Sequence, residues 1–389
     1  MNKLMILKDK LYKHLDEIVV LIIFCVIFAY ITFYCRSDLW SHMQSAIKNM
    51  EDGTLMRGNF LLYLLIDILA GFSGDWRITG LALSLVLALS TALRYRLVRD
   101  TLKTSETDGK ILKLFAFSML FIYVLPFSYI LGPFGFWDTN QMYLPFITPT
   151  IWHNSTTLML FPFAFLLFIM SVKQIDEYSP RRNMWICMLV ALNVFIKPSF
   201  FFCFCCAYPL MMIYKYHLKS VFWKSMIPVG VGILCLSYVY VSIYESGVDN
   251  SSIAFNMDVL SIDFWLNKSI RLLCSIIFPL CYFIFNIKKC VRDAEFYYVL
   301  ILFLVGMAIS YFFIELGPRY GHGNLSWQVH ICMWLLYYYV LKNILPTIIV
   351  FFKGGKIDAK NIVLLILYSV CLLTGIFYFV KYMITKDYY

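Results

Sequence analysis

The stretch RSDLWSHMQSAIKNM, residues 36 to 50, directly follows the first long apolar run of the chain. At helical spacing its apolar residues gather on one side, while Asp38 and His42 lie one turn apart on another. The stretch therefore predicts an amphipathic helix that holds an acid and an imidazole at a membrane surface. Its apolar side comprises Leu39, Met43, Ala46, Ile47 and Met50.

The composition of the 389-residue chain is that of a polytopic membrane protein. Hydrophobic residues make up 61% and charged residues 14%, whereas soluble proteins are about one quarter charged. The mean hydropathy is +0.75. The net charge of +10 could indicate a nucleic-acid partner, but the positive-inside rule also places Lys and Arg in cytoplasmic loops. Because this rule accounts for the positive charge, no nucleic-acid partner is expected. The twelve cysteines show no metal-type spacing and predict no disulfide framework.

Eleven apolar runs approach the length of about 20 residues that a membrane-spanning helix needs. They predict an all-α, polytopic transmembrane helix bundle with about eleven spans and no soluble domain. The predicted spans are residues 18–35, 77–93, 111–131, 157–172, 184–196, 199–214, 222–243, 272–287, 296–314, 328–345 and 361–380.

The segment 59–72 is apolar, but it is short for a span and contains Asp67. We expect a surface or re-entrant helix here, because the Lys and Arg residues that follow the second span then share a side with the lysine-rich N-terminus. On this assignment most of the 33 Lys and Arg residues lie on one side. The asymmetry predicts a cytoplasmic N-terminus.

The chain is expected to form one transmembrane domain, residues 1–389, whose long loops face outward. Functional residues are often carried by long loops on a rigid scaffold, so a site is expected on the external side. The cytoplasmic N-terminus is predicted at 1–17, and the external loops at 36–76, 132–156, 244–271 and 315–327.

Asp38 and His42 are the first candidate pair. A carboxylate at the rim of a bundle can take a proton from a hydroxyl nucleophile, or together with an imidazole hold a divalent cation such as Mg²⁺ or Mn²⁺. The alternative is that Asp38 only caps a helix that begins at Leu39, because Asp is a preferred N-cap residue.

The second external loop, residues 132–156, is rich in Pro, Phe and Trp and carries no Lys or Arg. It is too apolar for a solvated loop and too broken for a span, which predicts a re-entrant or interfacial loop. Its titratable residues Asp138 and His153 are candidate substrate ligands. The alternative for His153 is a cap on the fourth span.

Lys197, in NVFIKPSF, lies between two short apolar runs and precedes Pro198, which interrupts the helix. A lysine at the outer end of a helical hairpin is suited to a phosphate or pyrophosphate at headgroup depth. The alternative is a side chain that snorkels to the interface.

The loop ELGPRYGHGNLSWQVH, residues 315–330, gathers Glu315, Arg319, His322 and Asn324 among three glycines. Glycines permit close approach of a ligand to the backbone, and the guanidinium of Arg319 matches a phosphate. This loop is predicted to bind substrate, with a plain turn as the alternative.

Together these features resemble the GT-C superfamily of membrane glycosyltransferases, which use polyprenyl-phosphate-linked sugars. In that superfamily an acid in the first external loop serves as base or metal ligand, and Asp38 in SDLWSH occupies that place. The Lys197 turn is similar to the lysine-proline or lysine-glycine turn of many members. WHNST and GPRYGHGN also resemble membrane proteins of bacterial surface-polysaccharide synthesis. The resemblance covers the layout of residues 1–215, with one acid where many members have a pair.

The resemblance implies sugar transfer from a polyprenyl-phosphate donor to a glycan or lipid-linked acceptor at the outer face of the membrane. The compact loops favour a bacterial inner membrane. Asp38 and His42 would act in catalysis, and Lys197 and Arg319 on the phosphate. A polymerase or ligase that uses lipid-pyrophosphate glycans stays open and would rely more on Arg319 and His322. A flippase also stays open, and it would place polar residues along mid-span faces.

Overall fold

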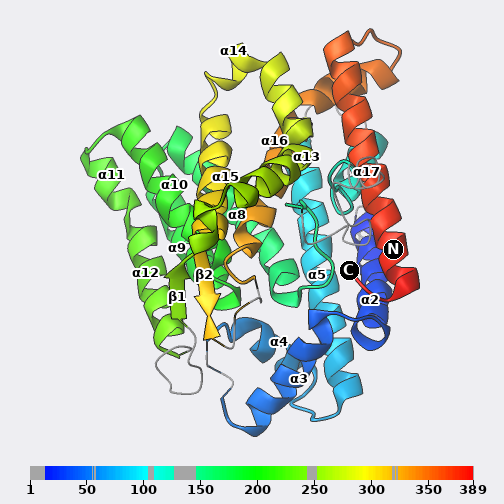
Figure 1. Cartoon of the computed structure of the whole chain (residues 1–389), viewed down its shortest axis with the longest axis vertical. Coiled ribbons are helices and arrows are strands. Elements are labelled where there is room, and N and C mark those ends of the chain that lie inside the picture. Colours follow the sequence, from blue (N-terminus) through cyan, green and yellow to red (C-terminus); the bar gives the residue numbers. More distant parts are fainter. Residues whose placement is uncertain are drawn as a thin grey trace, which may run out of the picture.

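The computed structural model describes residues 14–54, 56, 58–103, 109–126, 146–242, 252–317, 320 and 323–388. Within them the chain forms a bundle of long helices with one two-stranded antiparallel sheet (Figure 1). In chain order the elements are α2 (Leu15–Tyr34), α3 (Asp38–Glu51), α4 (Leu61–Leu69), α5 (Trp76–Leu102), α6 (Gly109–Ser118), α8 (Ser155–Asp176), α9 (Pro180–Ile196), α10 (Ser199–Tyr216), α11 (Ser220–Ser225), α12 (Ile227–Tyr240), β1 (Ser252–Phe255), the 3-10 helix η3 (Met257–Leu260), α13 (Ile262–Phe285), α14 (Ile287–Cys290), α15 (Ala294–Phe312), β2 (Phe313–Leu316), α16 (Trp327–Phe352) and α17 (Ala359–Thr385).

Nine of the described helical segments are long and apolar enough to cross a membrane. They are α2, α5, α8, α10, α11 together with α12, α13, α15, α16 and α17. Long apolar runs form helices in a bilayer because a helix satisfies its own backbone polar groups. The predicted all-α membrane bundle is thus confirmed.

Two of the eleven predicted spans are not helices of spanning length. Among the described residues of the run 111–131, only those of α6 are helical, and residues 119–126 after it are not helical. Aromatic packing holds this segment: the Met119 carbonyl accepts a hydrogen bond from Trp334 (3.0 Å), and Tyr123 stacks against Trp152. The run 184–196 forms α9, whose 17 residues fall short of the roughly 20 residues expected.

The stretch 36–50 forms α3, which buries Leu39, Met43 and Ala46, three residues of its predicted apolar side. The helix begins at Asp38 with Ser37 as its N-cap, so the reading of Asp38 as the cap is wrong. Both α3 and α4 are too short to cross a bilayer, and they lie together at the lower end of Figure 1. The α14 connection lies at the upper end.

Candidate functional site

The structure brings Asp38 and Lys197 together through Asn154. Asn154 donates a hydrogen bond from Nδ2 to Asp38 Oδ2 (2.8 Å), and Lys197 Nζ donates to Asn154 Oδ1 (3.1 Å). The backbone N–H of Asp38 also donates to the carbonyl of His153 (3.0 Å). The start of α3, the start of α8 and the turn between α9 and α10 therefore build one polar cluster.

Lys197 is buried, with 5% of its surface exposed, so the snorkelling alternative is wrong. Besides Asn154, its ammonium donates to Thr156 Oγ1 (3.1 Å) and Thr157 Oγ1 (3.2 Å), and it lies 4.9 Å from the ring centroid of Trp327. Burial lowers the pKa of Lys197 to about 7, against the opposing effect of Asp38 and a second nearby acid. All three ammonium donors thus have oxygen acceptors within the protein.

Local capping explains why these groups meet. Asn154 is the N-cap of α8, and its Oδ1 accepts from the backbone N–H of Thr157 (3.0 Å). Asn is a preferred N-cap because its side chain satisfies a free amide of the first turn. Since Asn154 performs this role, the reading of His153 as the cap is wrong. On the other side, Pro198 separates α9 from α10 and leaves Lys197 in the turn.

The histidines around the cluster are held by protein groups. His42 Nδ1 is 2.8 Å from the Tyr63 hydroxyl of α4, and the His153 ring stacks on Tyr388 at 4.2 Å. Burial, reinforced by the positive charge of Lys197, lowers the pKa of both His42 and His153 to about 3. Both imidazoles are therefore neutral near pH 7.

The two strands carry a second acid toward the cluster. β1 pairs antiparallel with β2, with Ile253 opposite Glu315, and Glu315 is 6% exposed. Asn324 Nδ2 donates to Glu315 Oε2 (2.7 Å). Glu315 also raises the pKa of Lys197, which places its carboxylate within electrostatic range of the ammonium.

Three predicted site residues, Asp138, Arg319 and His322, lie outside the described residues. Among the residues that the structure describes, no group of three or more His, Cys, Asp or Glu side chains is arranged to hold a metal ion. Asp38 and His42, the predicted metal candidates, therefore do not belong to such a group within that part of the chain.

Three groups of the cluster were not predicted from the sequence: Asn154, Thr156 and Thr157. The position of Asn154 just before the fourth predicted span was a usable signal, because Asn favours the N-cap. Asp67, one turn after Tyr63 on α4, is 1% exposed, and its Oδ2 has no hydrogen-bond partner within the described part of the chain. Burial raises its pKa to about 6.

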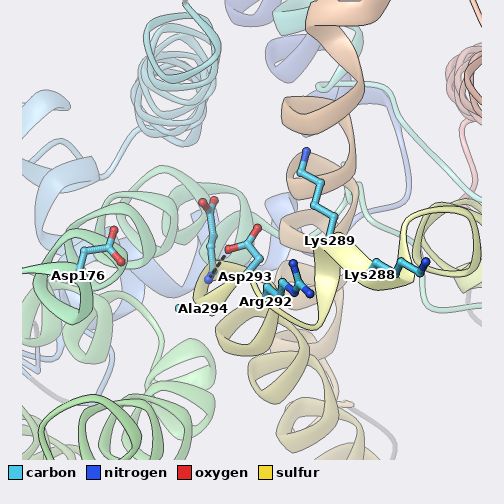
Figure 2. A pocket seen from close by; sticks show the side chains of 7 residues that line it. Asp176, Lys288, Lys289, Arg292, Asp293 and Ala294 are labelled. Carbon is cyan, nitrogen blue, oxygen red and sulfur yellow. Dashed lines mark hydrogen bonds between the residues drawn. The ribbon is translucent and has the colours of Figure 1, made fainter.

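A hollow of about 640 Å³ lies at the opposite end of the bundle (Figure 2). Two of its three acids bond to the neighbouring helix α16: Asp293 accepts from the Tyr339 hydroxyl (2.6 Å), and Glu295 accepts from Lys342 (2.6 Å). The hollow is lined by Asp176, Lys288, Lys289, Arg292, Asp293, Ala294 and Glu295.

Comparison with models of known protein families and with curated protein sequences gave no match. The fold and its long apolar helices define the chain as a polytopic membrane helical protein.

Proposed function

We propose that the protein is a GT-C-like membrane glycosyltransferase. It transfers a sugar from a polyprenyl-phosphate donor to a glycan or lipid-linked acceptor at the external face of a bacterial inner membrane, with the N-terminus inside. The observation that supports this proposal is the Asp38–Asn154–Lys197 chain of hydrogen bonds. An oriented carboxylate at the end of a membrane bundle is what a general base for a lipid-linked substrate requires.

In the proposed reaction, Asp38 takes the proton of the acceptor hydroxyl while the phosphate of the donor leaves. Asn154 holds Oδ2 of Asp38, and Oδ1 makes no hydrogen bond within the described part of the chain, so Oδ1 faces the acceptor. His42, neutral and bonded to Tyr63, orients that hydroxyl. Arg319 compensates the charge that develops on the leaving phosphate.

The role of Asp38 is tested with purified Asp38→Asn protein and a polyprenyl-phosphate sugar. We expect turnover to fall by about 10²- to 10⁴-fold, because a general base contributes that much, while donor binding is retained. Asp52→Asn is the matched control, because Asp52 is an exposed acid at the end of the same helix. Wild-type turnover in Asp38→Asn would overturn the assignment.

The same assay separates the other functions. Product formed only from a lipid-pyrophosphate glycan would replace the proposal with a polymerase or ligase. Movement of the lipid between leaflets of liposomes without any new glycosidic bond would replace it with a flippase.

A further inference from the structure

The first half of α13 turns an apolar stripe away from the protein. Ile262, Leu266, Ile270 and Leu273 are spaced by four, four and three residues, which places them on one face. Their exposed fractions are 77%, 60%, 40% and 50%. In a membrane protein such a stripe contacts lipid chains.

The stripe of α13 that faces the protein carries two cations. Phe264, Lys268, Arg271 and Ser275 also share one face, and each is less exposed than the apolar stripe on the other side. A helix at the edge of a bundle usually turns apolar residues toward its neighbours. Here the inward positions are a lysine and an arginine one turn apart.

Neither cation is neutralised by the residues that the structure describes. Lys268 Nζ lies over the rings of Phe264 (5.6 Å) and Tyr311 (5.9 Å) rather than beside an acid. The buried Nε of Arg271 has no hydrogen-bond partner in the described structure. The acid that interacts electrostatically with Lys268 is Asp258, which is exposed on η3 and forms no ion pair with Lys268 within the described residues. Two neighbouring, partly desolvated positive charges without a counter-ion are unfavourable unless an anion joins them.

The helix that carries the cation pair contacts the loop that leads to the Asp38 cluster. One turn after Arg271, Ser275 Oγ accepts from the backbone N–H of Ile147 (3.1 Å). The next residue, Thr148, accepts at its carbonyl from His330 Nδ1 (2.7 Å). This loop continues directly into His153 and Asn154 of the cluster.

We propose that Lys268 and Arg271 bind the phosphate of a lipid phosphate at the lipid-exposed edge of the bundle that α13 forms. The proposal rests on the proposed function and deepens it, because it names where the donor binds. Lys197 is a poor candidate for this task, since its three donors already have acceptors. The Arg271 guanidinium and the Lys268 ammonium can instead approach one phosphate from two sides.

The test measures binding to the purified full-length protein in detergent, read from tryptophan fluorescence because Trp265 lies 5.9 Å from the Tyr311 ring. The probes are farnesyl phosphate, farnesol and inorganic phosphate. We expect farnesyl phosphate to bind about tenfold more weakly to Lys268→Ala and to Arg271→Gln, as loss of one charge-assisted hydrogen bond predicts. Arg271→Lys should bind farnesyl phosphate more tightly than Arg271→Gln, because it keeps the positive charge although it loses the guanidinium fork.

Lys288→Ala is the matched control, since Lys288 is an exposed cation on α14 at the opposite end of the bundle. Unchanged farnesyl phosphate affinity in both α13 variants would overturn the site. If the wild-type protein bound inorganic phosphate as tightly as farnesyl phosphate, a lipid ligand would be contradicted. If it bound farnesol as tightly as farnesyl phosphate, recognition of the phosphate would be contradicted. Melting curves show whether each variant is folded. If Arg271→Gln does not fold, Arg271→Lys and Lys268→Ala still test the site.

The site and the proposed function fail differently. Asp38→Asn should bind farnesyl phosphate like wild type. Charge-dependent binding at α13 without any sugar transfer supports the lipid-phosphate site and contradicts the glycosyltransferase. Sugar transfer that survives in both α13 variants at wild-type donor affinity supports the enzyme and overturns the site.

Discussion

Lys197 occupies a position where an isolated charge would be strongly unfavourable. Three oxygen acceptors, the face of Trp327 and two nearby carboxylates compensate the loss of water. The same positive charge, together with burial, keeps His42 and His153 neutral. At the scale of single residues, the cluster therefore combines one cation with imidazoles that stay uncharged.

We expect the free energy of unfolding to decrease as the pH falls from 6.5, the ordinary histidine pKa, toward about 3, the folded pKa of His42 and His153. In this window the unfolded chain binds protons that the folded site excludes, so acid favours unfolding. Melting temperatures in detergent between about pH 4 and pH 8 measure the effect. His153→Gln should reduce the slope of melting temperature against pH. His217→Asn, at an exposed histidine with a left-handed backbone, should leave it unchanged. An unaltered slope in His153→Gln would contradict the expected titration.

At the scale of elements, the non-helical segment 119–126 is accommodated by close packing against α17. A Cβ added to Gly375 would overlap the carbonyl oxygen of Phe121, so only glycine permits this approach. Phe121 and Tyr123 in turn pack edge-on against Phe379 and flat against Tyr378 of the same helix. The segment is thus held by side-chain contacts where a helix was expected.

Gly375→Ala is therefore expected to destabilise the protein by about 1–3 kcal/mol, the usual cost of forcing extra volume into a packed interior. Gly230→Ala provides the contrast, because that helical glycine on α12 has open space around it. It should gain about 0.5–1 kcal/mol from the higher helix propensity of alanine. The measurement is the melting temperature of both variants in the same detergent. An equal change in melting temperature for the two variants would refute the packing explanation.

At the scale of the whole molecule, the two ends of the bundle differ in chemistry. One end holds the Asp38 cluster, whereas the other holds exposed Lys288, Lys289 and Arg292. α8 connects them, from Ser155 beside the cluster to Asp176 at the hollow. From the positive-inside rule we propose that the cationic end faces the cytoplasm.

This orientation predicts which end an impermeant reagent reaches. In a cysteine-free background, Gln44→Cys on α3 should react with a membrane-impermeant maleimide in intact cells. Lys289→Cys should react only after the membrane is permeabilised. Both positions are exposed, so burial does not explain a difference. Labelling of Lys289→Cys in intact cells would reverse the orientation.

The sequence alone determined the membrane class, most of the spanning helices and the amphipathic α3, because these follow from local hydrophobic length and helical periodicity. The sequence also identified Asp38 and Lys197 as candidate site residues, each on its own local pattern. Their connection through Asn154 was decided only by the tertiary structure, since it depends on α3 packing beside the start of α8 and on the α9–α10 turn. The failure of 111–131 to form a complete helix was decided in the same way, because aromatic contacts distant in sequence outweighed its local preference.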